Sequence, residues 1–268
     1  MQPNCAAADA RDRICPIGLR DLGRRAFKPV YILYYRLLFG RRFPFYVKLA
    51  ARVHAWELAT GRGDAPVAKE VWEAQYGRGG WEFMRGLDEV ARYSVIAGFL
   101  HHLKPGGSVL DVGGGEGLLA DHLRPFGYAR YLGVDLSETA VRQAAGRADE
   151  RTSFIAADAE SYTPPERWDA IVFNECVYYF NDPLGTVQRY ESSLEDGGVF
   201  IVSAFRSRRA DVIVRRLLTR YRLLEETAVS NRKGTWVVRV LTPPPPPASA
   251  APRPAVPRSG AAGSASGG

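Results

Sequence analysis

The stretch VLDVGGGEG, residues 109–117, decides the fold. Apolar residues around Asp111 predict a short strand, and four of the next five residues are glycine. Glycine lets a backbone come close to a ligand, because it has no Cβ to clash. The stretch therefore predicts a strand, a ligand-binding turn and the start of a helix.

The spacing of the glycines excludes two phosphate-binding motifs. When the dinucleotide pattern G-x-G-x-x-G is placed on Gly113 and Gly115, Leu118 stands where the third glycine is required. The ATP loop needs a lysine after its last glycine, and none follows Gly117. The carboxylate of Asp111 would repel a pyrophosphate but favour an ammonium group. S-adenosylmethionine fits this pattern, since it carries an ammonium group and a ribose but no phosphate.

Strand and helix patterns alternate along the rest of the chain. Short joins between apolar strands predict a doubly wound, mostly parallel sheet. The last two strands are joined too tightly for a crossover helix, so they predict an antiparallel hairpin. Helical patterns at 67–76, 81–90 and 91–103 are expected to lie over the carboxyl ends of the strands. The predicted strands are 108–112, 129–135, 152–157, 168–174, 197–205, 221–230 and 234–241.

Two further acidic residues end predicted strands. Asp135 ends the second strand, about 20 residues after the glycine turn, where an acid accepts hydrogen bonds from ribose hydroxyls. Asp158 ends the third strand, where it is expected to accept the adenine amino hydrogen. Local roles remain open, because Asp111 is also a candidate helix cap and Asp158 a candidate Asx-turn residue. Ser137 already supplies a helix cap after Asp135, so a second capping role for Asp135 is less expected.

In its motifs the chain resembles the class I S-adenosylmethionine-dependent methyltransferases that act on small molecules. The resemblance covers about residues 70–241 and rests on VLDVGGGEG, YLGVDLSETAVRQA, FIAADAES, WDAIVFNECVYYF and LEDGGVFIVSAF, in the family's order. It implies a Rossmann-like α/β fold of seven strands, with strand seven antiparallel between five and six. It implies that the cofactor lies across the ends of strands one, two and four. The implied cofactor-binding residues are Tyr76, Asp111, Gly113, Gly115, Gly117, Asp135, Leu136, Asp158, Ala159 and Asn174.

The segment NECVYYF, residues 174–180, is where acceptor chemistry is expected. Glu175, Tyr178 and Tyr179 are the candidate catalytic residues, although plain packing under the next helix is an alternative. Tyr76 has a similar alternative, as an ordinary aromatic residue at a helix end. The absence of an Asn-Pro-Pro-Tyr-type loop here argues against amino methylation of nucleobases or glutamine. The sequence thus predicts the methyl donor and leaves the acceptor open, as an O or N atom of a small molecule.

A second functional hypothesis is a methyltransferase-like module that binds the cofactor without transferring a methyl group.

The distribution of charge indicates whether a nucleic acid is a partner. The net charge is +7, but residues 1–60 hold 11 Lys/Arg against 4 Asp/Glu, whereas residues 61–242 hold 23 against 25. Enzymes that act on nucleic acids usually concentrate positive charge around the active site. The near-neutral central region therefore predicts no nucleic-acid partner.

Composition divides the chain into three parts. Residues 1–65 are expected to form a basic, aromatic helical leader or lid, and residues 66–242 the methyltransferase domain. Residues 243–268 are rich in Pro, Ala and Gly and are expected to be a disordered tail. Within the leader, residues 20–60 have the composition of a membrane-surface helix. We favour a lid packed on the catalytic domain instead.

The positions of the cysteines and histidines argue against a disulfide-stabilised protein and against a metal-binding protein. Cys5, Cys15 and Cys176 form no C-x-x-C pair, which argues against a disulfide framework and a zinc site. No histidine stands in a cluster with ligand spacing, so no metal is predicted. The N-terminal residues lack the apolar region of a signal peptide, and we expect a cytoplasmic protein.

Overall fold

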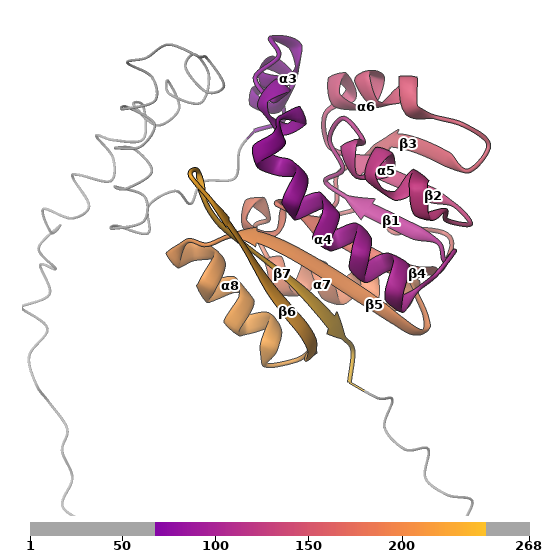
Figure 1. The fold of residues 1–268 in the computed structure, drawn as a ribbon, viewed down its shortest axis with the longest axis vertical. Coiled ribbons are helices and arrows are strands. Elements are labelled where there is room, and N and C mark those ends of the chain that lie inside the picture. The colour runs from indigo at the N-terminus through magenta and orange to yellow at the C-terminus, as the bar shows by residue number, and fades with distance from the viewer. Residues whose placement is uncertain (1–67, 245–268) are drawn as a thin grey trace, which may run out of the picture.

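The structure is a computed structural model that describes residues 68–244. One seven-stranded sheet runs through these residues in the order β3-β2-β1-β4-β5-β7-β6 (Figure 1). The first five strands are parallel, and β7 is antiparallel to both β5 and β6. The predicted doubly wound sheet with an antiparallel hairpin is confirmed. The strands are β1 (Val109–Val112), β2 (Tyr131–Asp135), β3 (Thr152–Ala156), β4 (Trp168–Asn174), β5 (Leu194–Phe205), β6 (Arg222–Asn231) and β7 (Gly234–Thr242).

Helices cover both faces of the sheet (Figure 1). Apolar side chains of α4 and α5 pack on one face, and those of α7 and α8 pack on the other. The α-helices are α3 (Lys69–Gly77), α4 (Leu87–Leu103), α5 (Leu118–Leu123), α6 (Glu138–Ala144), α7 (Pro183–Arg189) and α8 (Arg208–Leu218). The short 3-10 helices are η2 (Glu82–Arg85), η3 (Arg124–Phe126), η4 (Ala145–Arg147), η5 (Val177–Tyr179) and η6 (Tyr190–Ser193).

The central strands are apolar because both of their faces are covered. From Ala170 to Phe173, the side chains of β4 are completely buried. A parallel strand covered on both faces needs such a continuous apolar run, whereas a strand with one wet face alternates. This packing fixes the carboxyl ends of β1, β2 and β4 relative to one another, and functional groups follow at those ends.

Two helices begin at side-chain caps, and the first of these caps, Ser137, was predicted from the sequence. The Ser137 hydroxyl accepts a hydrogen bond of 3.1 Å from the amide of Ala140 at the start of α6. Asp182 caps α7 through the amide of Gly185, and Pro183 stands in the first turn. Side-chain acceptors at these positions satisfy amides that have no partner within the helix. The chain therefore leaves β2 and β4 in defined directions.

The helices before the sheet differ from the prediction in one respect. The expected helices 81–90 and 91–103 do not meet at residue 90, because α4 is continuous from Leu87. The break lies at Gly86, whose extended backbone separates η2 from α4. Apolar residues occur at helical spacing on both sides of Gly86, so periodicity alone did not reveal the break.

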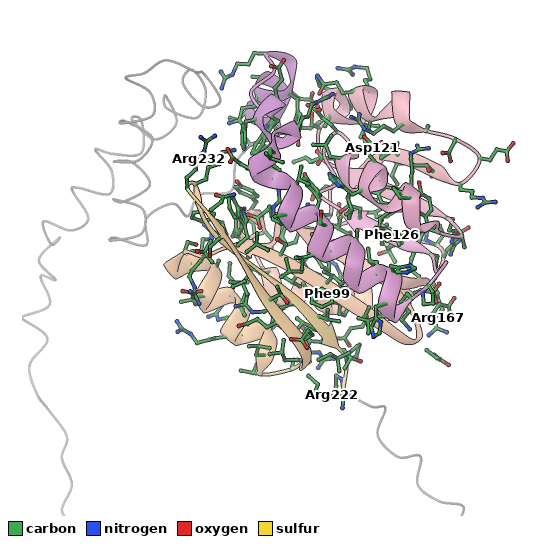
Figure 2. The ribbon with its side chains drawn as sticks, in the orientation of Figure 1. Phe99, Asp121, Phe126, Arg167, Arg222 and Arg232 are labelled. Carbon is green, nitrogen blue, oxygen red and sulfur yellow. The ribbon has the colours of Figure 1, made fainter. Side chains whose placement is uncertain are left out.

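The tip of the β6–β7 hairpin reaches the first turn of α4. Arg232, labelled in Figure 2, contacts the carboxylate of Asp88 at 2.9 Å. The neighbouring Lys233 ammonium donates to Glu89 at 3.0 Å. The hairpin thus holds the start of α4 against the sheet.

The predicted leader, residues 1–65, lies outside the described residues, as does the tail beyond Pro244. The predicted domain boundaries and the two interpretations of the leader therefore stay predictions. Within residues 68–244, none of the helices has the length and apolar character needed to cross a membrane.

Candidate functional site

A cavity of about 290 Å³ opens at the carboxyl ends of β1, β2 and β4. Its floor comes from residues 113–116 of the glycine turn (residues 113–117) and from residues at or just after the ends of β2, β3 and β4. Its upper wall comes from α3, α4 and the segment between them. All of the predicted cofactor-binding residues except Gly117 line it. Parallel strands bring their carboxyl ends to one edge of the sheet, which is why motifs distant in sequence meet here.

The glycine turn is held by backbone hydrogen bonds to the end of β2. The Val134 carbonyl accepts from the amides of Gly113 (2.7 Å) and Gly114 (3.0 Å). Gly113 and Gly115 have φ values of +73° and +56°, a region that residues with a Cβ rarely adopt. A Cβ on Gly113 would lie 2.6 Å from the Cβ of Cys176. The turn therefore needs these glycines for its own packing as well as for access to a ligand.

Gly117 packs against β3, and its predicted contact with the cofactor stays a prediction. It does not line the cavity, and its φ of +75° starts α5. A Cβ on Gly117 would lie 2.5 Å from the Phe154 ring. The third glycine of the pattern thus permits close packing between the turn and β3.

Asp111 is a buried carboxylate with an unsatisfied oxygen. The residue is 1 % exposed, its Oδ2 accepts from the Tyr131 hydroxyl at 2.5 Å, and its Oδ1 has no partner. Burial, with a smaller contribution from the nearby Asp135, raises the pKa of Asp111 to about 7. The helix-cap interpretation is wrong, because α5 has no side-chain cap. A buried carboxylate without compensation is costly, so this oxygen suits a positively charged ligand group.

Asp135 joins the glycine turn to the start of α6. Its Oδ2 accepts from the Gly115 amide, and its Oδ1 accepts from the Ser137 amide, both at 2.9 Å. Burial raises the pKa of Asp135 to about 6. Ser137 caps α6 as expected, and Asp135 accepts from the backbone amide of that capping residue. Each oxygen still has a lone pair for a further donor, and the ribose role stays a prediction.

Asp158 and its neighbours form the exposed rim of the cavity. Asp158 accepts from the Glu160 amide at 2.9 Å, which is the Asx turn that the sequence left open. Leu136 and Ala159 line the cavity on the same side. Glu160 in turn accepts from the backbone amide (2.8 Å) and side-chain amide (2.7 Å) of Asn181. The rim is thus tied to the segment that follows β4.

Asn174, at the end of β4, is oriented from behind by a buried arginine. Arg92 on α4 is 1 % exposed and donates to the Asn174 side-chain oxygen. It also donates to Glu89 at 3.1 Å, and Glu89 receives Lys233 from the hairpin. Arg92 was not predicted from the sequence, where its only signal was being the one lysine or arginine in α4.

The three candidate catalytic residues have different surroundings. Glu175 has a φ of +62° and accepts from the Ser203 hydroxyl (3.0 Å), the Tyr178 hydroxyl (2.7 Å) and the Phe205 amide (3.1 Å). Burial raises the pKa of Glu175. Tyr178 bonds to Glu175 and does not line the cavity, whereas Tyr179 lines it. Glu175 and Tyr178 therefore hold the segment after β4 in place.

Aromatic side chains form one side of the cavity, which we call the aromatic wall: Trp72, Tyr76, Trp81 and Tyr179. Trp72 packs edge-on against Tyr179 with ring centroids 4.8 Å apart, and Trp81 stacks on Trp72 (5.7 Å) and Tyr76 (5.8 Å). Tyr76 is therefore more than a helix-end aromatic residue, because it is part of the cavity. Neither tryptophan was predicted as a site residue from the sequence. Two tryptophans close to the glycine-rich segment 77–80 were a usable signal.

A carboxylate on α3 fixes the aromatic wall to the sheet. Glu73 accepts from the amides of Glu138 (2.7 Å) and Thr139 (3.1 Å) and from the Ser137 hydroxyl (3.1 Å). Burial opposes ionisation, but these hydrogen bonds prevail and lower the pKa of Glu73. The first amides of α6 have no partner within the helix. Glu73 satisfies them and so holds α3 beside the glycine turn.

The histidines within residues 68–244 have ordinary surroundings. His101 and His102 are exposed in the last turn of α4. His122 stacks on Tyr93 with ring centroids 4.8 Å apart. Among these described residues, no group of three or more His, Cys, Asp or Glu side chains is placed to hold a metal ion.

Comparisons with known proteins bear on this arrangement. The chain is 30% identical over 163 residues to the ribosomal protein L11 methyltransferase of Thermus thermophilus, covering 59% of this chain and 61% of the relative. It is 33% identical over 101 residues to a ubiquinone biosynthesis O-methyltransferase of Leptothrix cholodnii, covering 35% and 43%. The chain thus spans only about half of the length of these relatives.

The fold is similar to that of the N-methyltransferase NodS from Bradyrhizobium japonicum, solved in complex with S-adenosylhomocysteine. The TM-score is 0.57 at 18% identity, covering 64% of this chain and 98% of the other. A family model described as a methyltransferase domain matches residues 82–236, which is more than half of the chain. The chain therefore belongs to the methyltransferase domain family, whose members use S-adenosylmethionine, and the predicted family, fold and cofactor are confirmed.

Proposed function

We propose that this protein transfers a methyl group from S-adenosylmethionine to an oxygen or nitrogen atom of a small-molecule acceptor. The observation that carries the proposal is the unsatisfied Asp111 oxygen, buried in a cavity between the glycine turn and the aromatic wall. A cavity of about 290 Å³ is close to the size of small-ligand sites, which begin at roughly 300 Å³.

The residues of the floor fit the cofactor. Asp111 offers a carboxylate oxygen to a positively charged group, and the glycine turn offers a backbone without side chains. We assign Asp135 to ribose hydroxyls and Asp158 to the adenine amino group. Leu136 and Ala159 complete the apolar part of this floor, and Asn174 its far end.

Positioning is the main task of the protein in such a reaction. S-adenosylmethionine supplies a methyl group on positively charged sulfur; the acceptor lone pair forms the new bond, and the electron pair of the broken S–C bond stays on sulfur. The aromatic wall excludes water and orients the acceptor, and Arg92 fixes the orientation of Asn174. Alignment of two reactants contributes on the order of 7–11 kcal/mol. An acceptor proton would leave to solvent water at the open side of the cavity.

A transfer assay tests the proposal. The full chain is incubated with S-adenosylmethionine tritiated in the methyl group and with a cell extract, which is then separated into lipid, glycan, protein and metabolite fractions. We expect label in the metabolite fraction, and its loss in Asp111→Asn. Gly98→Ala is the matched control, because a Cβ on Gly98 would meet nothing within 4 Å.

Label confined to the protein fraction would refute a small-molecule acceptor. Bound S-adenosylhomocysteine without label in any fraction would instead favour the cofactor-binding module without transfer activity. That alternative gains weight from Glu175 and Tyr178, whose polar groups bond to the protein itself.

A further inference from the structure

The charge of the cavity lining is strongly one-sided. Among residues 68–244, the lining includes no lysine, arginine or histidine. The carboxylate side chains that line it are Asp111, Glu116, Asp135, Asp158, Glu160 and Glu175. A cavity with walls of one sign attracts ligands of the opposite sign and repels like charges.

Arginines compensate for two of these carboxylates from outside the lining. Arg85, half-exposed at the rim, bonds to Glu116 at 3.1 Å. Arg92 lies behind Asn174 and favours the ionised form of Glu175. Among the ion pairs formed by the described residues, none involves Asp111, Asp135, Asp158 or Glu160, and only Asp111 feels an arginine, Arg92, at longer range. The cofactor brings a net charge of about +1, so negative charge remains after it binds.

The unsatisfied Asp111 oxygen shows that the cavity takes positive charge, and the cofactor is assigned to this oxygen, so the acceptor would meet the other carboxylates. The residue is 1 % exposed, lines the cavity and has no donor for Oδ1. The ordinary compensation for a buried carboxylate is a cation or a set of hydrogen-bond donors.

The aromatic wall adds a second means of binding cations. The faces of tryptophan and tyrosine rings carry partial negative charge, and a cation within about 6 Å of a ring centroid is attracted to it. Trp72, Trp81 and Tyr179 line the cavity together. Glu160 lies at the rim of the same cavity and is held in place by Asn181. The wall and rim therefore combine aromatic surface with negative charge.

We propose that the acceptor binds as an organic cation, an amine on an apolar or planar frame, recognised by the aromatic wall and the carboxylates of the cavity. The inference rests on the proposed function, because it treats the wall as the acceptor side of the methyltransferase site. It names nitrogen compounds as the substrate class and excludes phosphorylated and carboxylated acceptors. The bound ammonium gives its proton to solvent water, and the freed nitrogen lone pair then forms the bond to the methyl group.

Binding of three probes of similar shape to the full chain tests this proposal. The protein is saturated with S-adenosylhomocysteine and titrated with phenyltrimethylammonium (cation), 2-phenyl-2-propanol (neutral) or 2-phenylpropanoate (anion). Calorimetry and tryptophan fluorescence report binding. We expect the cation to bind at least tenfold more tightly than the neutral probe, with the anion weakest. High salt should reduce the advantage of the cation, because salt screens charge.

Variants locate the binding. Trp81→Leu and Glu160→Gln should each weaken the cation by at least threefold and leave S-adenosylhomocysteine affinity within about twofold. Glu150→Gln, an exposed residue in the turn before β3, is the matched charge control and should change neither affinity. The probe comparison uses the unaltered chain, so it decides the question even if a variant fails to fold.

Equal binding of the cation and the neutral probe, or tighter binding of the anion, would overturn the inference while leaving the methyltransferase function intact. Failure of S-adenosylhomocysteine itself to bind would instead refute the proposed function. The two failures are therefore distinguishable in one set of titrations.

Discussion

The floor and the wall of the cavity are built in different ways. The floor consists of the glycine turn and the acids at the ends of β1 and β2, and contacts 20 residues apart hold it together, such as Gly115 with Asp135. The wall depends on contacts between more distant segments, such as Glu73 with Ser137, 64 residues later. The proposed donor site is therefore encoded in a short stretch of sequence, whereas the proposed acceptor side depends on tertiary packing.

The largest expected effect is at the floor. Gly113→Val would place a branched side chain at a φ of +73° and a Cβ 2.6 Å from Cys176. We expect at least a hundredfold loss of S-adenosylhomocysteine affinity by calorimetry, with circular dichroism to monitor folding. Gly98→Ala, in an open helical position, should retain full affinity. A folded Gly113→Val protein with normal affinity would show that the turn does not form the floor.

A smaller loss is expected when the floor keeps its shape but loses one acid. Asp135→Ala removes the acceptor of the Gly115 and Ser137 amides and the assigned ribose contact. Hydrogen bonds to a charged group contribute roughly 1.5–3 kcal/mol each, so affinity should fall at least tenfold. An unchanged dissociation constant in a well-folded variant would refute the assignment.

The pH dependence of stability tests the floor separately from the wall, because the two acids with raised pKa values belong to the floor. Burial raises the pKa of Asp111 to about 7 and that of Asp135 to about 6. Asp111 faces the Tyr131 hydroxyl, Asp135 and, at longer range, Arg92. In the free protein the folded state then binds more protons than the unfolded state between about pH 4 and 7, so stability falls as pH rises through this range.

Thermal unfolding from pH 5 to pH 8 measures this effect. We expect the free protein to lose several degrees in Tm, since about 1 kcal/mol corresponds to roughly 2–4 °C in a domain of this size. S-adenosylmethionine, which brings positive charge to these acids, should bind more tightly as pH rises. Asp111→Asn should flatten both dependences. A Tm that increases steadily from pH 5 to pH 8 would contradict the burial of these acids.

The smallest effect is expected at the anchor of the wall. Glu73→Gln retains the shape of the side chain but weakens the hydrogen bonds that it accepts from the α6 amides. A loss of about 1–2 kcal/mol in stability is typical when such hydrogen bonds are weakened. We expect the cofactor affinity to fall by only a few-fold. Tryptophan fluorescence should report greater solvent access to Trp72 and Trp81, whereas fluorescence identical to that of the unaltered chain would show that Glu73 does not hold the wall.

Sequence patterns located the sheet closely, because its strands are continuous apolar runs bounded by turns. The main strand error was β5, which begins at Leu194 and not at residue 197. Its early start contains Gly197 at a φ of +73° and a shift in register opposite β4. An irregular strand start of this kind is determined by pairing with another strand, and it leaves no periodic pattern in the sequence.

The candidate site divides in the same way. The acids and glycines of the floor were predicted because the glycines follow the first strand in a recognisable pattern and the acids stand at strand ends. Arg92 and Glu73 were not, because a charged residue in a helix is usually solvated, and only the folded chain brings it to Asn174 or to α6. Gly117 lies close to Phe154, a contact that spacing in the sequence cannot reveal and that leaves its predicted ligand contact untested.

The most direct test of the central claim is calorimetry of the full chain with S-adenosylhomocysteine and with NAD. The account predicts that S-adenosylhomocysteine binds at a single site and that NAD gives no heat, because the glycine turn lacks the third glycine of the dinucleotide pattern and its acid disfavours a pyrophosphate. Tight NAD binding with no response to S-adenosylhomocysteine or S-adenosylmethionine would contradict it.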